Sequence, residues 1–167
     1  MSASAADPAA SAAALVAALT EAGRWLAVAE SCTGGLLAAA ITDVAGASRC
    51  FHGGVVSYAN EAKAGWLRVD PALIDTHGAV SSEVAEAMVS GLLATTPADL
   101  ACAITGIAGP GGGTREKPVG LVYIGVGDAR GIEVHRCRFD GDRAAVRAAT
   151  VARALALLLA RAEGGGA

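Results

Sequence analysis

The sequence predicts an α/β fold in three layers, α/β/α, with a mixed five-stranded sheet between the helices. Two features predict it. Short apolar runs typical of buried strands alternate with segments whose apolar residues recur every three or four positions, as in amphipathic helices. Toward the C-terminus, two apolar runs flank the turn-like residues GDARG, which favours a hairpin. With 167 residues, 53% of them hydrophobic, the chain can bury one core without disulfides or metal.

The helices have start and stop signals in the sequence. Ser11 can cap a first helix, and Gly23 can end it. Residues 1–10 are therefore expected to form a disordered tail, and residues 11–163 a single domain. The other helices are expected over residues 34–44, after Asn60, after Ser81 or Ser82, and after Asp142.

The strand directions follow from the connections. The strands are expected at Trp25–Ala29, Phe51–Tyr58, Leu100–Thr105, Gly120–Val126 and Ile132–Phe139. Right-handed crossovers make the first three parallel, while the hairpin makes the fourth antiparallel and the fifth parallel again. The segments ESCTGG, YANEAK, TGIAGPGGG and DGDR, which follow strands one, two, three and five, should then share one edge of the sheet. Open α/β sheets bind their ligands at that edge.

Composition excludes several classes of function. The four cysteines form no C-x-x-C pair, which fits reduced thiols and a cytoplasmic location, and no His, Cys or acidic cluster suggests a metal site. With a net charge of −3 and no basic run, a nucleic-acid partner is not expected. No apolar run is long enough for a membrane span. No cofactor motif stands out, because the glycine-rich loop matches neither a dinucleotide nor a P-loop pattern.

Ser31 is the candidate nucleophile. It lies between a strand and a helix, and the backbone N–H groups of Thr33, Gly34 and Gly35 would be free to bind a developing oxyanion. The alternative is that Ser31 or Thr33 merely caps the helix. Cys32 is interpreted as a packing residue, since no histidine falls in a loop of this edge to serve as its base.

Lys63 is the candidate base, because no histidine is available to Ser31. A helix N-terminus and partial burial both disfavour an ammonium ion and lower the lysine pKa. Tyr58 could relay a proton or hold the substrate, and Glu30 could orient Lys63 or the substrate. The alternatives are a solvated lysine, a packing tyrosine and a charged turn residue.

Substrate binding is assigned to the remaining polar groups and glycines of this edge. The loop after the third strand would form a backbone-lined wall with Thr105 and Gly106, although a plain connection is equally compatible with the pattern. Asn60 follows the second strand. Arg143, one turn before Arg147, is suited to binding a phosphate, with a solvated arginine as the alternative.

Five stretches closely resemble the CinA C-terminal domain family: AESCTGGLLAAAITDVAGAS, GGVVSYANEAKAGWLRV, HGAVSSEVAEAM, AITGIAGPGGGTREKPVGLVYI and FDGDRAAVR. The resemblance spans about residues 11–160. It implies a mixed five-stranded sheet and hydrolysis of the carboxamide of nicotinamide mononucleotide to nicotinate mononucleotide and ammonia. It also implies a serine nucleophile at Ser31, an assisting lysine at Lys63, and Tyr58 nearby.

Two alternative functions stay open. The chain could be a nucleotide-binding or regulatory module, linked to competence or DNA damage, that kept the pocket without catalysis. It could instead be an amidase that uses Cys32. Whether Lys63 acts alone or through Tyr58, and whether other pyridine nucleotides are substrates, is not fixed by sequence. A homodimer is expected because the apolar segment Leu155–Leu159 exceeds what one sheet obviously covers.

Overall fold

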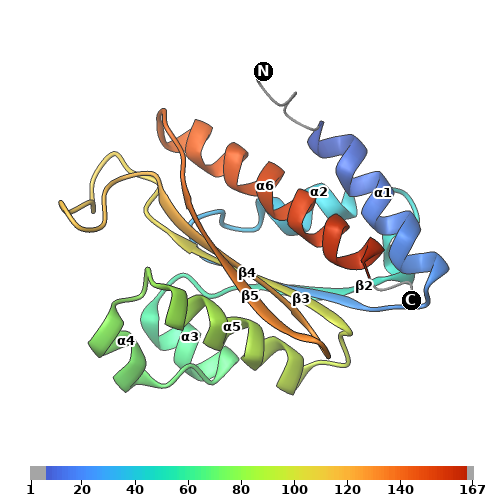
Figure 1. The fold of residues 1–167 in the computed structure, drawn as a ribbon, viewed down its shortest axis with the longest axis horizontal. Helices are drawn as coiled ribbons and strands as arrows, with labels where there is room; N and C mark the ends of the chain where they lie inside the picture. The colour runs from blue at the N-terminus through green and yellow to red at the C-terminus, as the bar shows by residue number, and fades with distance from the viewer. Residues whose placement is uncertain (1–6, 165–167) are drawn as a thin grey trace.

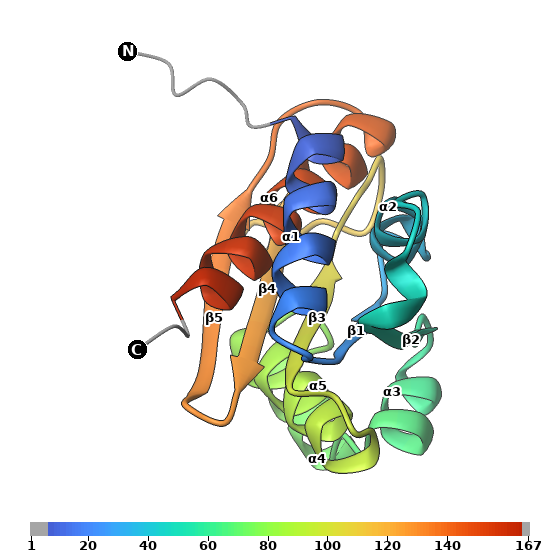
Figure 2. The same cartoon turned by 90° about the vertical axis from the view of Figure 1, so that its right-hand side faces the viewer.

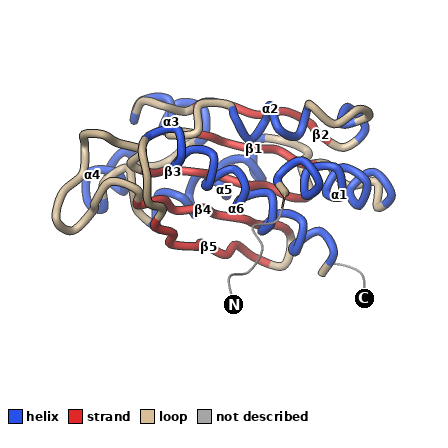
Figure 3. Tube along the Cα trace, turned by 90° about the horizontal axis from the view of Figure 1, so that it is seen from above, coloured by secondary structure: helices blue, strands red, loops and turns tan. Residues whose placement is uncertain are grey.

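The computed structural model describes residues 7–164 and shows a single twisted sheet between two layers of helices (Figure 1). Its strands are β1 Leu26–Glu30, β2 Phe51–Val56, β3 Leu100–Gly106, β4 Leu121–Asp128 and β5 Gly131–Arg138. They lie side by side in the order β2-β1-β3-β4-β5 (Figure 3). β1 pairs in parallel with β2 and β3, whereas β4 is antiparallel to both β3 and β5. The predicted α/β class and strand directions are confirmed.

The helices divide evenly between the two faces of the sheet (Figures 1 and 2). One face is covered by α1 Pro8–Glu21, α2 Leu36–Thr42 and α6 Arg143–Glu163. The other is covered by α3 Asn60–Leu67, α4 Pro71–His77 and α5 Ser82–Thr95. A short 3₁₀ turn, Ala47–Arg49, precedes β2. Each face therefore has its own helical cover, as a three-layer architecture requires.

The core consists of two apolar clusters, one on each face of the sheet. On the side of α1 and α6, Leu15, Leu155 and Leu158 are fully buried, and on the side of α5 the same holds for Met88. Burying one such side chain contributes about 1.5–3 kcal/mol. Within the segment Leu155–Leu159, Leu155 and Leu158 thus pack in the core, while Leu157 and Leu159 are only partly buried against it. The homodimer itself stays a prediction.

Two helix starts differ from those predicted. α1 begins at Pro8 and is capped by Asp7, whose carboxylate accepts a hydrogen bond from the N–H of Ala9 at 3.1 Å, so Ser11 lies inside the helix. Proline is favoured at the first helical position because it needs no hydrogen-bond partner there. Three residues of the predicted tail, 8–10, are thus helical, and residues 1–6 lie outside the described part of the chain.

Of the other predicted helix caps, two are present and one is not. Ser81 and Asp142 cap α5 and α6, each accepting a backbone N–H, as predicted. Asn60 does not cap α3, since Ala59 occupies that position without a side-chain hydrogen bond. Helix α4 was not predicted, although Asp70 caps it and Pro71 begins it. No helix in residues 7–164 is long and apolar enough to cross a membrane.

Candidate active site

A cavity of about 280 Å³ opens at the edge of the sheet where β1, β2 and β3 end. Its wall includes Ser31, Lys63, Thr105 and Arg143, together with the loop that precedes α5. The loop after β3 and the beginning of α6 project at this edge, on the left of Figure 1. The predicted convergence of these segments is therefore present in the fold.

Lys63 lies at the floor of this cavity and is 1% exposed. Its Nζ donates hydrogen bonds to the backbone oxygens of Ser57, at 2.8 Å, and Tyr58, at 3.1 Å. The third contact of Nζ is with the hydroxyl oxygen of Ser31, at 3.2 Å. No carboxylate lies within ion-pair distance of Lys63 among the residues that the structure describes.

These surroundings disfavour the charged form of Lys63. Burial lowers the pKa of the Lys63 amine, and the neighbouring Cys32 opposes this only in part. A neutral amine has two N–H donors and one lone pair. The two carbonyls accept both donors, so the lone pair is directed at the hydroxyl of Ser31, which is the geometry of a base beside its nucleophile.

Cys32 has the features of a packing residue. It is 5% exposed, and burial, as the main cause, raises the pKa of its thiol to about 11. A Cβ on Gly106 would lie 3.1 Å from the Cys32 sulfur, so the thiol fills space against that glycine. The thiolate that a cysteine nucleophile needs is therefore not favoured here.

Two comparisons place the chain among known proteins. The model of the CinA C-terminal domain matches residues 9–162. The chain belongs to this family. A CinA-like protein of Geobacter sp. (strain M21) is 55% identical over 137 residues, which is 82% of this chain and 33% of that protein. The chain therefore spans about a third of the length of the curated relatives it matches.

Solved structures of the CinA family have the same fold. A competence/damage inducible protein from Agrobacterium tumefaciens matches with a TM-score of 0.90 and 42% identity, over 96% of this chain and 98% of that one. A competence damage-inducible protein A from Klebsiella pneumoniae matches with a TM-score of 0.92 and 37% identity, over 96% and 99%. Their names give no reaction or substrate.

Glu30 has a different role from those considered for it in this CinA domain. The residue is 1% exposed, and its carboxylate accepts hydrogen bonds from the N–H groups of Gly35, Leu37 and Ala38 at 2.9–3.1 Å. These are the free donors at the start of α2, whose own N-cap, Gly35, has no side chain. Glu30 thus caps α2 from the end of β1, and within the described residues its carboxylate makes no hydrogen bond or ion pair with Lys63.

The same contacts correct the proposed oxyanion donors. The N–H of Gly35 binds Glu30, and that of Gly34 donates to the carbonyl of Ser31 at 3.0 Å. Neither is free, so the oxyanion role expected of these two glycines is wrong. Both have positive φ, +59° and +100°, and shape the turn instead. Thr33 is fully buried, and its hydroxyl has no hydrogen-bond partner within the described residues.

Tyr58 and Arg143 form a pair at the rim. Nη2 of Arg143 donates to the Tyr58 hydroxyl at 3.0 Å, and Nη1 donates to the carbonyl of Gly109 at 2.9 Å. Tyr58 lines the same cavity as Ser31 and Lys63 and is 56% exposed, and its backbone oxygen accepts the hydrogen bond from Lys63. This arrangement gives no support to a proton relay through the Tyr58 hydroxyl.

The other predicted binding residues separate into two groups. Gly106 lines the cavity, and so does Thr105, but the Thr105 hydroxyl donates to the carbonyl of Ala79 at 2.7 Å rather than facing a ligand. Asn60 is exposed and lines a different hollow beside Pro71, so its assignment to this site is wrong. No cluster of His, Cys, Asp or Glu able to hold a metal ion occurs within residues 7–164.

Sequence reasoning missed two contributors. Ala79 and Val80 complete the wall of the cavity between β3 and α5. Both side chains are small and apolar, so nothing in the sequence indicated that this loop lines a site. Arg147 donates to the carbonyls of Cys32 and Thr33, both at 3.1 Å. Its place one turn after Arg143 on a helix that begins at this edge was the only available signal.

Proposed function

We propose that this domain hydrolyses the carboxamide of nicotinamide mononucleotide, releasing nicotinate mononucleotide and ammonia. The supporting observation is the buried amine of Lys63, 3.2 Å from the Ser31 hydroxyl and without a carboxylate partner in the described part of the chain. A lysine held neutral next to a serine has little structural value, because burial of an unpaired amine is costly. It suits a base that activates a nucleophile.

The reaction proceeds in two half-reactions. The Ser31 oxygen bonds to the amide carbon while its proton moves to Lys63, and the carbonyl electron pair moves to oxygen. The C–N bond then breaks, and the proton on Lys63 leaves with ammonia. Water repeats the sequence on the Ser31 ester: Lys63 takes a proton from the water, the carboxylate departs, and the serine proton is restored.

The substrate class rests on the resemblance and on the rim of the cavity. The positively charged pyridinium ring withdraws electrons from the amide carbon, so that a serine can attack it without a metal. A nucleotide monophosphate needs an anionic anchor, and Arg143 lies at the mouth of the cavity with its guanidinium on the Tyr58 hydroxyl. Arg143 therefore stays our candidate for the phosphate.

Ammonia release from nicotinamide mononucleotide tests the proposal. The wild type should turn the substrate over, and Ser31→Ala should lose at least about a thousandfold in kcat, as expected when a nucleophile is removed. Cys32→Ala is the matched control and should retain most of the activity. Substrate binding to Ser31→Ala, measured by calorimetry, should persist.

Two other outcomes would contradict the proposal. Tight binding of nicotinamide mononucleotide without turnover by the wild type would show a binding or regulatory module. Loss of turnover in Cys32→Ala, with Ser31→Ala active, would show a cysteine amidase.

A further inference from the structure

One side chain outside the cavity, that of Arg147 in α6, holds the turn that presents Ser31. Its Nε donates to the carbonyl oxygen of Cys32, and its Nη2 to that of Thr33, both at 3.1 Å. A guanidinium offers donors in a rigid planar fork, so two acceptors bound by it are fixed relative to one another. A Cβ on Gly34 would lie 3.3 Å from Nη2, which shows how closely the turn and the arginine approach.

These two bonds determine which way the neighbouring N–H groups face. In a trans peptide the C=O and the N–H point in opposite directions. The peptide between Cys32 and Thr33 has its oxygen on Arg147, so its N–H, that of Thr33, faces away from α6. Within residues 7–164 the N–H of Thr33 donates to no protein acceptor, whereas those of Gly34 and Gly35 are engaged.

We propose that Arg147 is a positioning residue for catalysis, which orients the Cys32–Thr33 peptide so that its N–H stabilises the oxyanion formed on Ser31. This inference rests on the proposed amide hydrolysis. When the Ser31 oxygen attacks, negative charge develops on the substrate carbonyl oxygen, in the cavity that Ser31 and Cys32 line. A donor fixed in advance stabilises that charge without having to reorganise. Arg147 keeps the donor fixed and itself contacts no reacting atom.

Arg147→Met tests this role. Loss of one oxyanion donor lowers kcat by about 100-fold to 1,000-fold. We expect a fall of about 100-fold in kcat, with KM for nicotinamide mononucleotide changed by less than about threefold. The pH at which activity reaches half its maximum should not move, since Lys63 keeps its surroundings. Arg147→Lys should be intermediate, because a single ammonium cannot grip both carbonyls as a fork does.

The matched control is Arg153→Met, on the exposed side of the same helix. It should retain wild-type kcat. If Arg147 only ties α6 to the turn, Arg147→Met will melt at a lower temperature but keep a kcat within about threefold of wild type, and the inference is overturned. If Arg147→Met does not fold, Arg147→Lys carries the same test.

A second readout separates this inference from the proposed function. A fluorophosphonate reacts with an activated serine by forming a P–O bond and expelling fluoride, and its phosphoryl oxygen occupies the oxyanion position. Ser31 labelling, followed by intact mass, should be at least tenfold slower in Arg147→Met. Equal rates would overturn the role of Arg147, whatever the natural substrate. If the wild type neither releases ammonia nor is labelled, the proposed hydrolysis fails, and this inference fails with it.

Discussion

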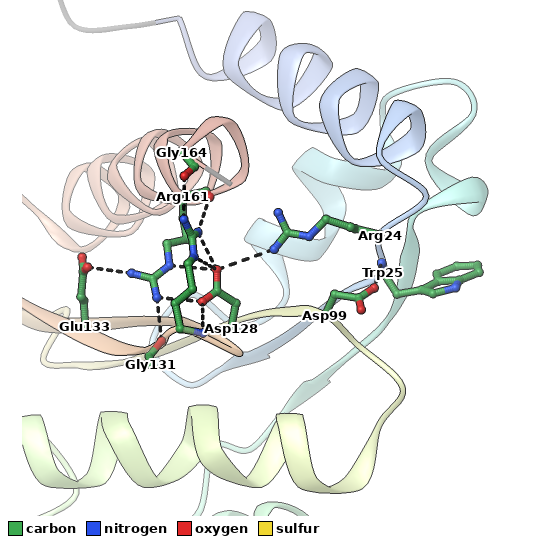
Figure 4. Close-up of polar contacts among 9 residues, drawn as sticks. Arg24, Trp25, Asp99, Asp128, Gly131, Glu133, Arg161 and Gly164 are labelled. Atoms are coloured by element: carbon green, nitrogen blue, oxygen red, sulfur yellow. Dashed lines mark hydrogen bonds and ion pairs between the residues drawn. The ribbon is translucent and has the colours of Figure 1, made fainter. Parts of the chain in front are cut away.

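Lys63 and Asp128 are both buried and ionisable, yet they lie at opposite edges of the sheet in opposite surroundings. Asp128, at the end of β4, pairs with Leu100 at the beginning of β3, whereas the cavity lies where β3 ends. The Asp128 carboxylate accepts hydrogen bonds from Arg130 and Arg161 at 2.6–3.1 Å, and Arg24 lies 3.7 Å away (Figure 4). Lys63 contacts only neutral oxygens.

The pKa values respond accordingly. Hydrogen bonds from Arg161, above all, hold the pKa of the Asp128 carboxyl well below its usual range, although burial opposes them. Burial lowers the pKa of Lys63. The surroundings therefore favour a charged carboxylate at Asp128 and a neutral amine at Lys63. The arginine contacts at Asp128 also tie the end of α6 to the β4–β5 hairpin, since Arg130 donates to the carbonyl of Gly164. The fully paired charge of Asp128 stabilises the fold, whereas the unpaired amine next to a hydroxyl is what supports the proposed role of Lys63 as a base.

Lys63→Met should have the largest effect and sharpen this contrast. Methionine has a similar length and lacks the base, so ammonia release should fall by about 10³-fold, within the range of general-base catalysis. In the wild type, kcat/KM should rise with pH as Lys63 loses its proton, and it should reach its plateau below the ordinary lysine range. An initial-rate series across pH measures both. Full activity in Lys63→Met would contradict the role of Lys63 as the base.

Asp128→Asn should have the next effect, and it should act on stability rather than on turnover. Breaking a buried ion pair costs about 3 kcal/mol or more, because the partners lose their compensation. We expect a loss of about 3 kcal/mol in the free energy of unfolding, measured by urea denaturation, with kcat unchanged. Glu133→Gln is the control: this carboxylate also binds Arg161, but its side chain is 62% exposed, and the loss should stay below about 1 kcal/mol.

The same aspartate predicts a dependence on acid. Because its pKa is lowered by folding, its stabilisation is complete above the unfolded value, about 3.8–3.9, and is lost as the pH falls further. The stability difference between wild type and Asp128→Asn should therefore shrink below about pH 4. A difference that stays constant down to pH 2.5 would show that the charge of Asp128 is not what stabilises this end.

The sequence predicted where Ser31 and Lys63 lie, because their positions follow from the directions of the strands. The hairpin and the right-handed crossovers are local rules, and they place Ser31 and Lys63 at one edge without any knowledge of side-chain contacts. Contacts between distant segments were out of its reach. Arg161 lies 33 residues from Asp128, and Arg147 lies 115 residues from Cys32, so no periodicity or motif links them.

Two of the differences from the sequence predictions, at Glu30 and Thr105, have a common physical cause. The sequence predictions considered only the chemistry of each polar side chain. The fold brings backbone N–H and C=O groups next to these side chains, and these groups form hydrogen bonds with them. Glu30 was considered for the substrate and instead satisfies the start of α2, which has no capping side chain of its own. Thr105, which was expected to bind the ligand, lines the cavity, but its hydroxyl donates to the carbonyl of Ala79. Most buried backbone donors and acceptors are paired within a fold, so a polar side chain that lies near one can be engaged there before any ligand binds.

The last expected effect concerns the stability that Lys63 itself costs. In the unfolded chain this amine keeps a proton up to about pH 10.5, whereas in the folded chain it loses the proton at a lower pH. Between those two values the unfolded state binds more protons, so the wild type gains stability as pH rises, by at most about 1.4 kcal/mol per pH unit. Lys63→Met lacks this gain. Urea denaturation of both proteins at pH 6 and pH 9.5 should thus show a larger rise for the wild type, all other titrating groups being shared. Equal rises would mean that Lys63 stays protonated in the fold, and a protonated lysine could not serve as the base for Ser31.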